Sequence, residues 1–166
     1  FTNKLTKIII SPLNGQFIFK DDKYLLGKSD KNNDEFDLLL FANRNIEEIS
    51  IPSNIKIISS YSFCEHKNLK KVEIPEDLNL QGIESNAFMS SKIEEIFIPQ
   101  KVLKIGESSF YKCQNLRKVE IPKNSNLQAI ESSAFSFSNI EEIFIPHSVT
   151  KISESLFSNC ENLRKV

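Results

Sequence analysis

The heptapeptide "IEEIFIP" occurs twice in this chain, at residues 93–99 and again at residues 140–146. Related phrases occur three more times, as "IEEISIP", "LKKVEIP" and "LRKVEIP". The closing prolines follow one another at intervals of 23, 24, 23 and 24 residues: Pro52, Pro75, Pro99, Pro122 and Pro146. The phrase is therefore one copy of a tandem repeat, and a repeat of this length indicates a solenoid built from stacked coils.

Apolar and polar residues alternate within each phrase, which predicts a short β-strand with one buried face. In the copy at 93–99, Ile93, Ile96 and Ile98 point inward. A single coil cannot bury such a face, so the coils stack and their strands form a parallel sheet. Proline has no backbone N–H and cannot continue a hydrogen-bonded ladder, so it ends each strand.

A second apolar pattern follows each proline and ends in an aromatic ring. One phenylalanine recurs in each coil: Phe63, Phe88, Phe110, Phe135 and Phe157. One ring per structural period is typical of a core position, so these rings should form a stacked aromatic column. A repeat length of 23 or 24 residues then predicts about six to seven coils in a single solenoid over residues 1–166.

The charges of the phrase alternate from coil to coil, so the complete period is 47 residues. Its third position alternates in sign along the chain: Glu48, Lys71, Glu95, Lys118, Glu142 and Lys165. Neighbouring strands lie about 4.8 Å apart, a spacing at which like charges would repel. Alternation instead predicts a ladder of opposite charges, each pair contributing about 0.2–1 kcal/mol, and less where water screens it.

The repeat is irregular near its start. A worn copy of the phrase, "LTKIIIS", occupies residues 5–11, and the next copy begins 41 residues after Leu5, at Ile46. The intervening runs at 16–20, 24–27 and 36–41 are separated by turn-like "KDDK" and "SDKNND". They predict a β-meander insertion at residues 16–41 that interrupts the solenoid. Residue 1 is Phe and "NLRKV" stops within a strand phrase, so we expect both ends to be truncated.

Composition and motifs favour no chemical function. The formal net charge of −1 gives no reason to expect nucleic-acid binding, and no apolar run approaches a membrane span. No catalytic residues, metal site or cofactor are predicted. Cys113 and Cys160 lie two coils apart, too far for a disulfide, and Cys64 is out of register, so we expect three free thiols.

"DKNNDEFD" at residues 30–37 has calcium-ligand types at Asp30, Asn32 and Asp34. The calcium-loop pattern then fails, because Glu35 stands where glycine is needed and Phe41 where a bidentate glutamate is needed. A solvated hairpin turn is the favoured interpretation.

The phrase at 140–163, "IEEIFIPHSVTKISESLFSNCENL", resembles the BspA-like leucine-rich repeat family, and the resemblance covers residues 42–166. It implies a right-handed solenoid with a short parallel sheet on its concave face. Turns, 3-10 segments and short strands would form the convex side. It also implies a non-catalytic protein-binding module, as in bacterial surface adhesins and surface antigens of parasitic protists.

The outward positions of the strands are the candidate binding residues: Ser50, Glu73, Phe97, Glu120 and Phe144. Phe97 and Phe144 either contact a protein partner or merely pack over neighbouring strands as part of a copied unit. We expect a cell-surface adhesin or antigen. The alternatives are an intracellular scaffold, which unpaired cysteines and the lack of an N-x-Ser/Thr sequon favour, and a structural spacer. Open solenoid ends predict self-association.

Overall fold

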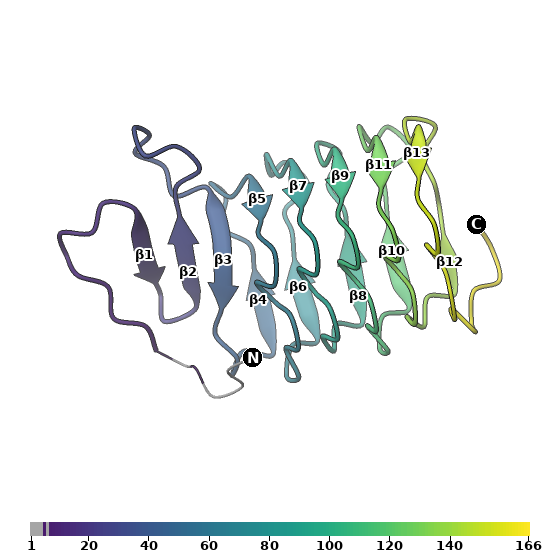
Figure 1. Ribbon diagram of the computed structural model, residues 1–166, viewed down its shortest axis with the longest axis horizontal. Helices are drawn as coiled ribbons and strands as arrows, with labels where there is room; N and C mark the ends of the chain where they lie inside the picture. Colours follow the sequence, from purple (N-terminus) through teal and green to yellow (C-terminus); the bar gives the residue numbers. More distant parts are fainter. Residues whose placement is uncertain (1–4, 6) are drawn as a thin grey trace.

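The computed structural model describes Leu5 and residues 7–166, and this part of the chain is a parallel β-solenoid without a helix (Figure 1). Each copy of the phrase supplies one strand of a five-stranded sheet: β4 Glu48–Ser50, β6 Lys71–Glu73, β8 Glu95–Phe97, β10 Lys118–Glu120 and β12 Glu142–Ile143. Their order in the sheet follows the order of the coils, and every pairing is parallel. The predicted leucine-rich repeat architecture is confirmed.

The opposite side of each coil also forms a sheet. Two-residue strands repeat there: β5 Ile57–Ile58, β7 Gly82–Ile83, β9 Lys104–Ile105, β11 Ala129–Ile130 and β13 Lys151–Ile152. They pair in parallel, and the sheet continues into the N-terminal strands to give the order β1-β2-β3-β5-β7-β9-β11-β13. Short strands on this side were expected, but their assembly into a continuous sheet was not.

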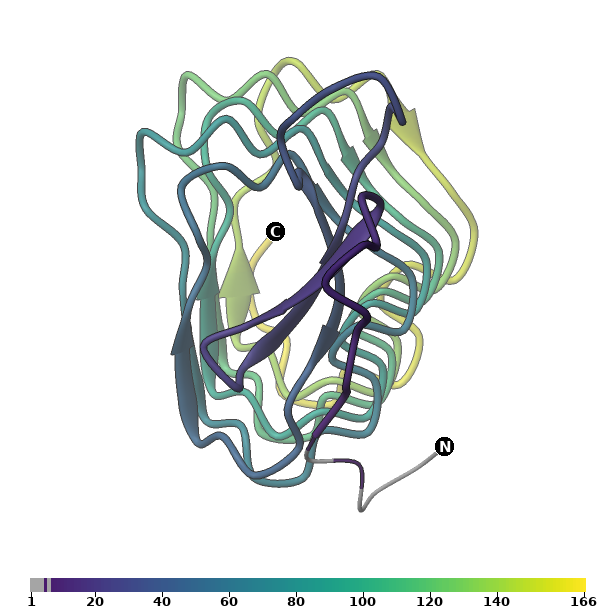
Figure 2. The same cartoon turned by 90° about the vertical axis from the view of Figure 1, so that its left-hand side faces the viewer.

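The N-terminal meander is present, but it covers the end of the solenoid. Its strands are β1 Phe17–Lys20, β2 Tyr24–Gly27 and β3 Leu38–Ala42, and β3 pairs in parallel with β5. Tyr24 and Leu26 of β2 are buried in the solenoid core, and the Tyr24 hydroxyl donates a hydrogen bond to the carbonyl of Ser50 at the far sheet. Figure 2 shows the β1–β2 hairpin crossing the end of the coils.

Among the described residues, the meander precedes all five strands of the five-stranded sheet. The worn copy at residues 5–11 forms no strand at its described positions, and β4 is the edge of the five-stranded sheet. Ile9 is 86% exposed and Leu13 is 96% exposed. Ser11 stands where the other copies have proline, and the segment lacks the second apolar pattern that would wrap it into a coil.

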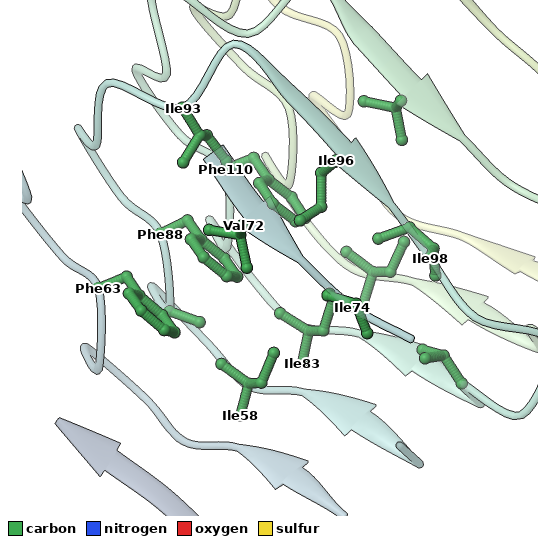
Figure 3. Packing of buried hydrophobic residues seen from close by; sticks show 14 of the residues in the cluster. Ile58, Phe63, Val72, Ile74, Ile83, Phe88, Ile93, Ile96, Ile98 and Phe110 are labelled. Carbon is green, nitrogen blue, oxygen red and sulfur yellow. The ribbon is translucent and has the colours of Figure 1, made fainter. Parts of the chain in front are cut away.

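The solenoid core is built around the predicted aromatic column. The rings of Phe63, Phe88, Phe110 and Phe135 are fully buried and stack nearly parallel, with centroids 4.8, 5.2 and 5.2 Å apart. Phe157 continues the column at 6.1 Å but is only partly buried. Isoleucines and valines of both sheets pack against these rings, as Figure 3 shows for three of the coils.

A second column, polar and buried except for the partly buried Cys160, runs three residues after each phenylalanine. It contains His66, Ser91, Cys113, Ser138 and Cys160. The thiols of Cys113 and Cys160 donate to the carbonyls of Phe88 and Phe135 in the preceding coil, at 3.1 and 3.0 Å. All three cysteines are free, as predicted, and burial raises the pKa of Cys113 to about 12. These two thiols therefore act as hydrogen-bond donors between coils as well as small apolar groups.

Candidate interaction surface

The outer face of the five-stranded sheet carries two rows of side chains that run across the strands. We call the first the charged row: Glu48, Lys71, Glu95, Lys118, Glu142 and Lys165. The strand register places each of these residues beside the next, and the last pair is a parallel bridge between Glu142 and Lys165. All six are exposed. The charges thus alternate in space as they do in the sequence.

The second row lies two residues further along each strand, and we call it the acid–aromatic row: Ser50, Glu73, Phe97, Glu120 and Phe144. Register pairs Ser50 with Glu73 and Phe97 with Glu120, and the adjacent register of Val119 with Ile143 brings Phe144 next to Glu120. All five predicted binding residues therefore lie in one line. The sheet brings them together because one side of a strand shows every second residue.

The two phenylalanines differ in their environment. Phe144 is 47% exposed, whereas Phe97 is less exposed and partly buried. Glu120 lies beside Phe97 on the neighbouring strand β10. Their chain neighbours Ile96, Ile98 and Ile143 are buried in the core. Both rings thus stand on the side of the sheet that faces away from the core, with Glu120 between them.

Two direct ion pairs lie on this face among the described residues. Lys70 Nζ lies 2.8 Å from Glu47 Oε2, one position before the charged row, and Lys118 Nζ lies 2.8 Å from Glu120 Oε2 on its own strand. Glu120, and then Glu95 and Glu142, raise the pKa of Lys118. Lys118 therefore pairs across the two rows rather than along the charged row, and the energy of the cross-strand ladder stays a prediction.

Three adjoining hollows mark the middle of this face, and Glu120 lines all of them. The first, about 440 Å³, lies between Phe97 and the turn after β10. The second, about 320 Å³, reaches Phe144, and the third, about 240 Å³, spans Glu73, Phe97 and Glu120.

Sequence reasoning missed part of the lining of the first of these three hollows. Glu76, Gln100 and Lys123 all come from the turns that follow the strand prolines. These positions differ from coil to coil, and that variation within a regular repeat was the available signal.

Residues 30–35 of the acidic segment form a mostly exposed turn between the antiparallel strands β2 and β3, as predicted, whereas Asp37 after this turn has a structural role. Asp37 is buried and accepts hydrogen bonds from the backbone N–H and hydroxyl of Ser29, and its Oδ2 lies 3.4 Å from Lys56 Nζ. Burial alone would raise the pKa of Asp37, but the bonds from Ser29 and Lys56 lower it overall. The part of the chain that the structure describes contains no group of three His, Cys, Asp or Glu residues arranged for a metal ion.

Nor does any helix within Leu5 and residues 7–166 have the length and apolar character needed to cross a membrane.

Comparison with known protein families identifies the repeat. Residues 36–164 match the BspA type leucine rich repeat region in six copies. Leucine-rich repeat solenoids are typically non-catalytic scaffolds that present an extended surface to other proteins. A comparison with curated protein sequences finds no significant match.

Several solved structures of bacterial proteins have similar folds. The pneumococcal vaccine antigen PcpA is 34% identical with a TM-score of 0.65, and the match covers 68% of this chain and 28% of the antigen. A leucine-rich repeat protein from Eubacterium ventriosum is 22% identical (TM-score 0.63), with 95% and 53% of the two chains covered. A leucine-rich cell surface protein from Faecalibacterium prausnitzii is 19% identical (TM-score 0.51), with 96% and 55% covered. This chain therefore spans between about a quarter and a half of these proteins.

Proposed function

Because the chain belongs to the BspA-type leucine-rich repeat family, we propose that it is a non-catalytic module that binds a protein partner through the outer face of its five-stranded sheet. The observation that carries this proposal is the acid–aromatic row. Phe97 and Phe144 flank Glu120 on a face with three adjoining hollows. Aromatic rings surrounded by a polar rim are the usual anchors of protein interfaces.

The rigidity of the scaffold supports the same proposal. The row stands on strands whose other side packs into a fully buried core, so its side chains have fixed spacing. A surface that is already ordered loses little conformational entropy when a partner binds. The conformational entropy lost on binding is then mainly that of the partner and of the long charged side chains on this face.

We place this binding at a cell surface, as an adhesin or antigen. Support comes from the similar pneumococcal vaccine antigen and from the leucine-rich cell surface protein of similar fold. An intracellular scaffold is the second candidate, because all three cysteines are free and the chain has no N-x-Ser/Thr sequon.

Site-specific photocrosslinking tests the proposed face. A photoreactive phenylalanine analogue at position 144 should crosslink to a protein in extracts or on intact cells. The same analogue at Leu103, which is 41% exposed beside β9 on the other sheet, is the matched control. Crosslinks formed equally from both positions, or from position 103 only, would contradict the assignment.

A further inference from the structure

We propose that the partner inserts a basic side chain, arginine in preference to lysine, into the hollow formed by Glu73, Phe97 and Glu120. This inference rests on the proposed function and names the chemistry that the face would recognise. The hollow has a volume of about 240 Å³, enough for one long side chain rather than for a folded segment. We call it the cation hollow.

An aromatic ring lines the cation hollow between two carboxylates. Phe97 lies on β8, between Glu73 on β6 and Glu120 on β10, and all three line the same hollow. Strand spacing puts the two glutamates about 10 Å apart at their backbones, so their side chains can lean in from both sides of the ring. A planar guanidinium can stack on an aromatic face while its N–H groups donate to carboxylates at its edge.

The charges that line the cation hollow do not balance. Three are negative, Glu73, Glu95 and Glu120, and two are positive, Lys71 and Lys118. One carboxylate is therefore left over, and Glu73 has no ion pair with any described residue. One incoming positive charge would complete the alternation that the charged row already shows.

The same face already holds a cation. The ammonium of Lys118 lies 2.8 Å from Glu120 Oε2, so this face already accommodates a positive charge beside a carboxylate. Glu120, Glu95 and Glu142 raise the pKa of Lys118, which is consistent with that contact. Because both groups of this pair are exposed, it is weak and can be exchanged. An acidic partner would face two glutamates of the acid–aromatic row, and an apolar one would bury Glu73 without an ion-pair partner, at a cost in free energy.

A set of short peptides tests the charge requirement directly. Capped pentapeptides Gly-Ser-X-Leu-Gly, with arginine, lysine, citrulline or glutamate as X, are titrated into the isotope-labelled protein at low salt. Chemical shifts of Glu73, Phe97 and Glu120 should move saturably with the arginine peptide. Citrulline has nearly the shape of arginine without its charge, and it should bind at least about fivefold more weakly.

Three variants separate local recognition from net charge. Glu73→Gln combined with Glu120→Gln should weaken the arginine peptide at least about fivefold, and Phe97→Leu should reduce the preference for arginine over lysine. Glu107→Gln, which removes an exposed charge remote from the sheet face, should leave affinity unchanged.

Equal binding of arginine and citrulline peptides, or shifts that map elsewhere, would overturn the inference. If that happens while position 144 still crosslinks to a protein, the proposed function stands and only the partner chemistry is wrong. Arginine-specific shifts in the hollow without any crosslinked partner would support the cation hollow and overturn the proposed function.

Discussion

Replacing Phe110 with alanine should lower the free energy of unfolding by about 3–5 kcal/mol, the usual cost of truncating a fully buried aromatic ring. Phe110 is 0% exposed, and its ring stacks on Phe88 and Phe135, each 5.2 Å away. Its loss leaves a cavity and removes the middle of the aromatic column. The coils on either side should then unfold in separate steps, because each coil contacts only its neighbours.

Chemical denaturation monitored by circular dichroism measures the loss of unfolding free energy. Hydrogen exchange shows whether the coils on either side of Phe110 unfold separately. Phe144→Ala is the matched control, because it removes the same ring from an exposed position. A loss below about 1 kcal/mol for Phe110→Ala, similar to that of the control, would mean that the aromatic column contributes little to the free energy of unfolding.

Acidification from pH 6.5 to 4 should destabilise the coil that contains His66 by about 3 kcal/mol. The His66 side chain is fully buried, and burial, with a smaller contribution from Arg44, lowers its pKa to about 4. Its Nε2 lies 2.8 Å from the carbonyl oxygen of Asn43, so Nε2 carries the proton and donates. Nδ1 has no hydrogen-bond partner among the described residues.

The direction follows from where the protons bind. The unfolded imidazole, with a pKa near 6.5, takes up its proton before the folded one, so the free energy of unfolding falls as the pH drops through this window. Asp37 acts in the same direction at lower pH. Its pKa is lowered in the fold, so its contribution is lost only as the pH falls through that lowered value.

Cysteine is a suitable replacement for His66, because Cys113 occupies the equivalent position in a later coil. His66→Cys should flatten the pH dependence between pH 6.5 and 4, and His147→Gln, which changes the other histidine, should leave it in place. Hydrogen exchange at residues 55–70 reports the local stability. An unchanged pH dependence in His66→Cys would contradict the assignment.

Much of the fold was predictable because the same sequence pattern occurs in every coil. The interval between prolines predicts the coil, and one phenylalanine per coil predicts the stacked column from Phe63 to Phe157. The alternation of Glu48 and Lys71 predicts the strand register, because like charges would meet if the coils slipped by one. Each inference uses a periodicity that several copies share.

The features outside the repeat were not predictable in the same way. The meander occurs once, so its place at the end of the solenoid depends on long-range contacts such as that from Tyr24 to Ser50. The second sheet was missed because its strands are two residues long and carry little pattern of their own. The acid–aromatic row followed from strand alternation, but the hollows depend on turn residues such as Gln100 and Lys123.

The most direct test of the binding face is a paired measurement on the double variant Phe97→Ala, Phe144→Ala. Its thermal midpoint should stay close to that of the wild type, because neither ring belongs to the buried core. Its affinity for the purified partner identified by crosslinking should fall by more than about 1 kcal/mol, roughly fivefold or more. A variant that unfolds like Phe110→Ala, or one that stays folded and binds as tightly as the wild type, would contradict the account.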